Sequence, residues 1–126
     1  METTRSNKFC TSISCMDGRI QLPIIHWLQE KYNVGFVDTI TEPGVDKLFS
    51  NSTKMEEIKA KVAISVNKHG SSLILVSGHH DCAGNPVSKS EHISHIKNTV
   101  KAVESWKFPV RVVGAWINDD WEVEVV

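Results

Sequence analysis

Two short runs of the sequence carry side chains that could do chemistry together. The run Cys15-Met16-Asp17-Gly18-Arg19 supplies a thiolate, with a carboxylate two residues later and a guanidinium four residues later. The run His79-His80-Asp81-Cys82 supplies an imidazole and a thiolate three residues apart. Cys15, His79 and Cys82 make a Cys2His zinc set. Three protein ligands leave the fourth tetrahedral position free for water, as in catalytic rather than structural zinc sites.

The composition is that of a soluble globular domain and argues against several other classes. With 126 residues, 40% of them apolar, the chain is expected to form a single domain over 1–126. A net charge of −1 gives no reason to expect a nucleic-acid or anionic-membrane partner. No apolar run approaches the roughly 18 residues of a membrane span, and we expect no signal peptide. An odd count of three cysteines favours reduced thiols and a cytoplasmic location.

Apolar patterning predicts strands that alternate with helices. Strands are predicted over residues 8–14, 35–40, 73–76 and 110–117, with Gly78 ending the third, and residues 121–126 are predicted to pair back as an edge strand. One helix is predicted to begin near Pro23 and end by Asn33 and Gly35. Two more are predicted to begin at capping boxes, residues 53–56 and 88–91.

This order predicts an α/β fold: a mainly parallel four-stranded sheet flanked by helices, with a C-terminal antiparallel edge strand. In such sheets ligands bind beyond the carboxyl ends of the strands. Cys15 is expected at the carboxyl end of the first strand, and His79 and Cys82 are expected just past the third. If these two strands are neighbours, the three ligands converge at one edge of the sheet.

The two motifs in this order resemble the β-class carbonic anhydrases. The resemblance rests on Cys15-x-Asp17-x-Arg19 after a first strand and Gly78-His79-x-x-Cys82 after a third, and it covers residues 9–116. It identifies a small, divergent member of that family. It implies a zinc lyase, a carbonate dehydratase, that reversibly hydrates carbon dioxide to bicarbonate through a zinc-bound hydroxide. It also implies a homodimer or higher homo-oligomer.

The resemblance further assigns roles to individual residues. Cys15, His79 and Cys82 would hold zinc, and Asp17 and Arg19 would form a dyad beside the fourth ligand position. In the family the aspartate either accepts a hydrogen bond from the zinc-bound water or moves onto the zinc and closes the site. The chemistry agrees, because a bidentate arginine can hold a carboxylate in an accepting pose. One departure is the stretch 39–44, where only Gly44 is kept of the family's Arg-Asn-Ala-Gly run.

Other candidate residues receive structural interpretations. Cys10 is expected in the core, and His80 and Asp81 in a loop, where His80 could carry protons. His92 and His95, three residues apart, could bind metal, but a solvated helix face is favoured. Glu42 is left open, since it could replace a lost family contact. A predicted dimer interface gathers the large apolar groups of the last strands: Trp116, Ile117, Trp121, Val123, Val125 and Val126.

Two classes of function remain open at this stage. The first is the zinc lyase acting on carbon dioxide, with hydrolysis of carbon disulfide or carbonyl sulfide as a variant that the motif does not separate. The second is a zinc-binding protein of the same fold without hydratase activity, used for binding, sensing or assembly. The Asp17–Arg19 pair favours the enzyme, since structural zinc does not need such a dyad.

Overall fold

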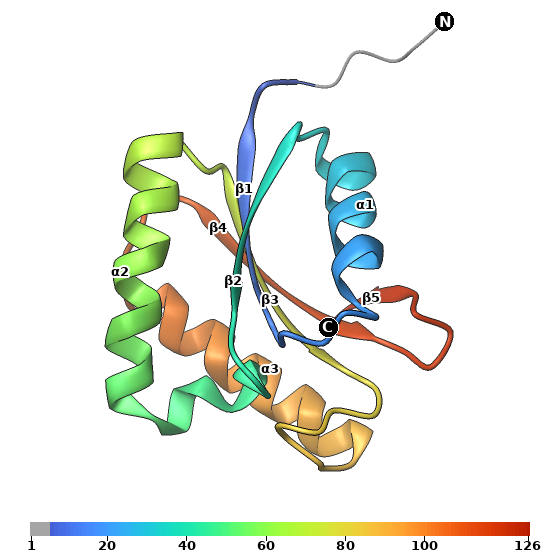
Figure 1. The fold of residues 1–126 in the computed structure, drawn as a ribbon. Coiled ribbons are helices and arrows are strands. Elements are labelled where there is room, and N and C mark those ends of the chain that lie inside the picture. The colour runs from blue at the N-terminus through green and yellow to red at the C-terminus, as the bar shows by residue number, and fades with distance from the viewer. Residues whose placement is uncertain (1–5) are drawn as a thin grey trace, which may run out of the picture.

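A five-stranded sheet with the strand order β2-β1-β3-β4-β5 forms the centre of the computed structural model, which describes residues 6–126 (Figure 1). The strands β1 (Phe9–Ser14), β2 (Phe36–Thr41), β3 (Leu73–His79) and β4 (Arg111–Ile117) run parallel, and β5 (Val123–Val125) pairs antiparallel with β4. The predicted fold class is therefore confirmed. The first and third strands are neighbours, as convergence of the two motifs requires.

Helices cover both faces of the sheet (Figure 1). One face packs against α1 (Gln21–Tyr32), whose Ile24 and Leu28 are buried there. The other face packs against α2 (Ser52–His69) and α3 (Lys89–Glu104). A short 3-10 helix, η1 (Val45–Ser50), joins β2 to α2 on this second face and was not predicted from the sequence.

The central strand β3 is buried along its whole length because both of its faces meet helices. Leu73 and Leu75 pack on the α1 side, and Ile74 and Val76 pack on the side of α2 and α3, as the two-residue period of a strand dictates. Sequence interpretation ended this strand at Gly78, which was wrong. Gly78 and His79 still pair with β4, so His79 lies on a rigid element rather than in a loop.

The starts of the two later helices show one correct and one wrong prediction. Ser88 caps α3, since its hydroxyl accepts a hydrogen bond from the Glu91 N–H at 3.2 Å. The capping box predicted at 53–56 is not used. Asn51 caps α2 instead, with its side-chain oxygen accepting from the Lys54 N–H at 3.0 Å. Asparagine is among the strongest N-cap residues, and its position two residues earlier adds about half a helical turn.

Two of the apolar residues assigned to a dimer interface lie inside this chain. Trp116 and Ile117 are buried in the two helix-covered cores, because the end of β4 is flanked by both β3 and β5. Val125 remains exposed on β5. Cys10 is fully buried, as predicted. Within residues 6–126, none of the helices combines the length and hydrophobicity that a membrane span requires.

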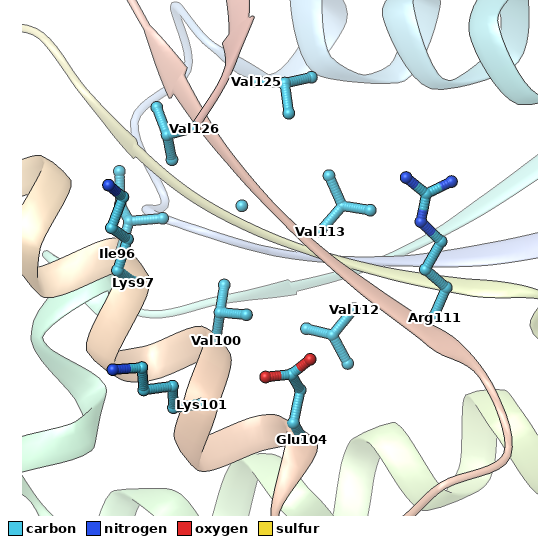
Figure 2. A pocket seen from close by; sticks show the side chains of 11 residues that line it. Ile96, Lys97, Val100, Lys101, Glu104, Arg111, Val112, Val113, Val125 and Val126 are labelled. Carbon is cyan, nitrogen blue, oxygen red and sulfur yellow. The ribbon is translucent and has the colours of Figure 1, made fainter.

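A groove of about 360 Å³ lies along the part of β4 that β5 does not reach (Figure 2). Its floor is apolar and includes Val100 of α3 and Val112 of β4, while Lys101 and Arg111 stand at its rim. None of the residues predicted to do chemistry lines this groove.

Replacing the observed cap should cost more stability than replacing the predicted one. We expect Asn51→Ala to lower the free energy of unfolding by about 1 kcal/mol, because the first turn of α2 loses its side-chain acceptor. Thr53→Ala, the matched control on the same exposed turn, should change it by less than about 0.5 kcal/mol. Urea denaturation measures both. Equal losses in the two variants would contradict the assignment of Asn51 as the cap.

Candidate metal centre

The three predicted ligands meet at the carboxyl edge of the sheet. Cys15 directly follows β1, His79 is the last residue of β3, and Cys82 lies three residues further on in the loop that leads to α3. Their ligand atoms all lie within 4.8 Å of one another, and all three side chains are buried. Neighbouring parallel strands supply this convergence, because β1 and β3 pair in register up to the residues just before the cluster.

The cluster has the dimensions of a zinc site. The two sulfurs lie 3.9 Å apart, and a tetrahedral ion with Zn–S bonds of about 2.3 Å separates two sulfurs by about 3.8 Å. The Nδ1 atom of His79 lies 2.7 Å from the carbonyl oxygen of His80, to which it can donate. The buried Nε2 atom has no hydrogen-bond partner among the described residues. An unpaired imidazole nitrogen facing two thiols fits a bound zinc ion.

The electrostatics of the cluster also favour a cation. Burial, and then the neighbouring Cys15, raises the pKa of the Cys82 thiol. Burial lowers the pKa of His79, which favours the neutral imidazole that a metal requires. Two buried sulfurs at this separation can both be thiolates only if positive charge lies between them. The Gly44 N–H also points to Cys15, with its nitrogen 3.5 Å from Sγ.

Two glycines let the loops around the cluster approach each other. A Cβ atom on Gly44 would lie 2.5 Å from the carbonyl carbon of Gly84, and one on Gly84 would lie 2.6 Å from the Gly44 nitrogen. Gly44 also has a φ of +59°, a conformation that suits glycine. Residue types with a side chain at either position would push the segment after β2 away from the segment after Cys82. The glycine kept in the stretch 39–44 therefore has a packing reason.

Asp17 and Arg19 form a bidentate ion pair beside the cluster. The Nε and Nη2 atoms of Arg19 lie 3.1 and 2.7 Å from the two carboxylate oxygens of Asp17. Hydrogen bonding from Arg19 holds the pKa of Asp17 down at about 2. Oδ2 of Asp17 lies 4.0 Å from Nε2 of His79, so the carboxylate is next to the position that a metal would occupy. It is ionised at neutral pH and available as an acceptor.

Three further residues hold this pair, and sequence reasoning did not assign them to the site. Asp81 accepts from Nη1 of Arg19 at 3.2 Å, and the ring centroid of Trp121 lies 4.7 Å from the guanidinium carbon. Gln21 donates its side-chain amide to the carbonyl oxygens of Cys15 and Asp17, at 2.8 and 3.1 Å. Asp81 and Trp121 both have positive φ angles although neither is a glycine, so the sequence offers no sign of these backbone conformations.

The remaining candidates lie outside the cluster. The expectation of a solvated face for His92 was wrong, since His92 is buried and hydrogen-bonds the carboxylate of Asp46, while its neighbour His95 contacts Asn85. His80 is exposed beside Trp121. Glu42 pairs with Lys54 at 3.3 Å and lines a separate pocket of about 230 Å³.

Known proteins resemble the chain in sequence pattern and in fold. A family model described as "Putative carbonic anhydrase" matches residues 5–126. No curated protein matches the sequence. Three solved structures are similar to the chain in fold, each at low identity.

The first is the β-carbonic anhydrase CafA of Aspergillus fumigatus, with a TM-score of 0.64, 12% identity, and coverage of 95% of this chain and 76% of that one. The second is carbonic anhydrase from Streptococcus mutans, with a TM-score of 0.59 and 18% identity. The similarity covers 100% of this chain and 87% of that one. The third is carbonic anhydrase from Glaciozyma antarctica, with a TM-score of 0.58 and 14% identity. The similarity covers 91% of this chain and 80% of that one. These structures support the fold, and the family model covers nearly the whole chain, so the protein belongs to the carbonic anhydrase family.

Proposed function

We propose that the protein is a zinc-dependent lyase that reversibly hydrates carbon dioxide to bicarbonate. The observation that carries the proposal is the buried Cys15–His79–Cys82 cluster with the Asp17–Arg19 pair at its side. A structural zinc site takes four protein ligands, whereas this cluster offers three. Membership of the carbonic anhydrase family supports the same reaction class.

In this proposal Cys15, His79 and Cys82 hold zinc. Bound zinc supplies Lewis acidity, which lowers the pKa of water in the open ligand position towards neutrality. Nδ1 of His79 donates to the carbonyl of His80 and so fixes the tautomer that leaves Nε2 as the ligand atom. The Gly44 N–H adds a donor to the Cys15 sulfur and offsets part of its negative charge.

Asp17 is proposed to orient the attacking water. Its carboxylate is ionised and lies beside the cluster, so it can accept a hydrogen bond and leave an oxygen lone pair directed at the carbon of carbon dioxide. Addition forms one C–O bond and breaks one C–O π bond, and a proton leaves to solvent or buffer. Arg19 holds the carboxylate in this pose through two hydrogen bonds.

The surroundings of Arg19 support a positioned dyad rather than a flexible surface pair. Arg19 is 45% exposed, and an ion pair at such a site is worth little by itself. Here the guanidinium is also held by the carboxylate and carbonyl of Asp81 and by the ring of Trp121. These contacts restrict Arg19 and through it the orientation of Asp17.

A zinc-binding protein without hydratase activity is the second candidate. The observation that favours it is the stretch 39–44, where Glu42 pairs with Lys54 in place of the family's Arg-Asn-Ala-Gly run. Hydrolysis of carbon disulfide or carbonyl sulfide by the same ligands is a further variant. Stopped-flow assays with each substrate on zinc-loaded protein separate the three.

The organisation of the protein is also proposed rather than established. We propose a single zinc domain over residues 1–126, a cytoplasmic location and a homodimer or higher homo-oligomer. Support for the dimer comes from the two ends of the sheet, where Phe36 of β2 and Val125 of β5 are half exposed. Edge strands present unpaired backbone groups that a second copy could satisfy.

Removal of one proposed ligand should remove the metal. We expect about one zinc per chain in the purified protein and a large loss in Cys82→Ser, because two remaining ligands bind zinc weakly. Cys10→Ala is the control, since Cys10 is a fully buried core thiol outside the cluster. Elemental analysis measures zinc per chain. Full zinc in Cys82→Ser, or none in the wild type, would contradict the ligand assignment.

Loss of the Asp17 charge should reduce hydration without releasing zinc. We expect Asp17→Asn to lower the rate of carbon dioxide hydration by about 10²-fold, since the amide keeps the shape but loses the charge that pairs with Arg19. The exposed Asp119 provides a control, and Asp119→Asn should retain full activity. Stopped-flow hydration gives the rates, and elemental analysis confirms the zinc content. An active Asp17→Asn enzyme would mean that the dyad is structural.

The close approach of the two loops should matter for metal binding. We expect Gly44→Ala to weaken zinc binding at least about tenfold, because the new methyl group would collide with the backbone of Gly84. Gly70→Ala is a matched control, since Gly70 has a similar φ of +66° but nothing within 4 Å of an added Cβ. Competition with a chromophoric chelator measures both affinities. Equal effects would show that backbone strain, rather than the loop contact, is responsible.

A further inference from the structure

A carboxylate lies buried behind the metal centre, and the proposed reaction does not use it. Asp46, in the first turn of η1, is only 1% exposed. Its Oδ2 accepts a hydrogen bond from Nδ1 of His92, and its Oδ1 accepts from Nδ2 of Asn85 at 3.0 Å. Thr99 donates to its carbonyl oxygen at 2.8 Å. Burying a carboxylate is costly unless it is paired, and both oxygens of Asp46 are hydrogen-bonded. These bonds explain how the buried carboxylate is tolerated, and its contacts with the surrounding segments indicate what it does.

The first link runs from Asp46 to the strand that carries His79. A Cβ atom on Gly78 would lie 2.6 Å from Oδ2 of Asp46, so the carboxylate packs directly against the backbone one residue before His79. Only glycine permits this approach. The position of Asp46 and the position of the end of β3 therefore depend on each other.

The second link runs to the loop that carries Cys82. Asn85 is 3% exposed and lies three residues after Cys82. Its side-chain amide donates to Oδ1 of Asp46 at 3.0 Å, so the loop that follows Cys82 is tied to the buried carboxylate. The Asp46–Asn85 hydrogen bond thus restrains the loop that carries Cys82.

The third link runs to Cys15. Gly44 precedes Asp46 by two residues, and its N–H points to the Cys15 sulfur. The same glycine packs against Gly84. Because Asp46 anchors the start of η1 to α3 through His92, it also sets where Gly44 lies relative to Cys15.

We propose that Asp46 is a positioning residue of the metal centre, whose carboxylate joins the three ligand-bearing segments through Gly78, Asn85 and the Gly44–η1 turn. The proposal rests on zinc binding by Cys15, His79 and Cys82. Residues behind the ligands commonly govern metal affinity, and their loss costs about 10–100-fold. Asp46 acts through backbone and loop placement, without touching the metal or the substrate.

The chain offers a matched control for this role. Asp38 on β2 also joins a histidine and a polar partner, since its Oδ2 lies 2.7 Å from both Nδ1 of His69 and Oγ of Ser65. Both of these partners lie outside the metal centre. Asp38→Asn and Asp46→Asn both remove a carboxylate charge that faces a histidine; only Asp46→Asn also removes an acceptor, since its two hydrogen bonds meet different oxygens.

The experiment measures zinc affinity of the full chain by chelator competition, with the free energy of unfolding of each zinc-free variant measured in parallel. We expect Asp46→Asn to bind zinc 10–100-fold more weakly than the wild type, and Asp38→Asn to stay within about threefold. Asn85→Ala removes the loop link but keeps the Asp46–His92 pair, so it decides the question if Asp46→Asn does not fold. It too should weaken zinc binding about tenfold or more.

A spectroscopic readout separates positioning from stability. In cobalt-substituted protein, the thiolate-to-cobalt charge-transfer bands should shift in Asp46→Asn or Asn85→Ala and remain in place in Asp38→Asn. Wild-type affinity and bands in both Asp46→Asn and Asn85→Ala would overturn the positioning role while leaving the zinc site intact. An equal loss of affinity in Asp38→Asn would also overturn it, since the effect would then be general destabilisation. A wild type that binds no zinc would instead defeat the proposed function.

Discussion

The parallel pairing of β1 and β3 is the constraint on which the candidate site depends. Because the two strands run side by side in the same direction, the residues that follow β1 and those that end β3 lie at the same edge of the sheet. His79 also pairs with Ile117 of β4, so its backbone is part of the sheet, whereas Cys15 and Cys82 lie outside the strands. Cys82 depends on the loop that follows, and Cys15 depends on the turn into α1.

The turn after Cys15 and the loop after His79 are held by different side chains. The turn is held by Gln21, which donates to two of its carbonyl groups, and by the Arg19 side chain that closes on Asp17. The loop is held by the hydrogen bond from the Asn85 side chain to the carboxylate of Asp46. Both segments therefore obtain their shape from polar contacts, whereas the strands that carry them obtain theirs from apolar burial.

Most of the fold could be predicted from periodicity, because buried runs such as residues 73–76 have few alternative environments. The convergence of Cys15, His79 and Cys82 could be predicted too, since these residues end or follow two neighbouring parallel strands. The buried state of His92 could not, because the spacing of His92 and His95 is also that of a solvated face. Its partner Asp46 lies on an unpredicted 3-10 helix, 46 residues away in sequence. The contact of Trp121 with Arg19 could not be predicted either, since it requires a positive φ at Trp121 in the β4–β5 turn.

The approach of the two cysteines has a consequence for the chain as a polymer. Cys15 and Cys82 are 67 residues apart in sequence, and their sulfurs lie 3.9 Å apart. An ion bound to both would act as a cross-link that closes a loop containing α1, β2 and α2. Cross-links over long loops restrict the unfolded ensemble most, by a term that grows with the logarithm of loop length. The same three side chains that suit the site to chemistry would then also contribute to the cooperativity of folding across more than half of the chain.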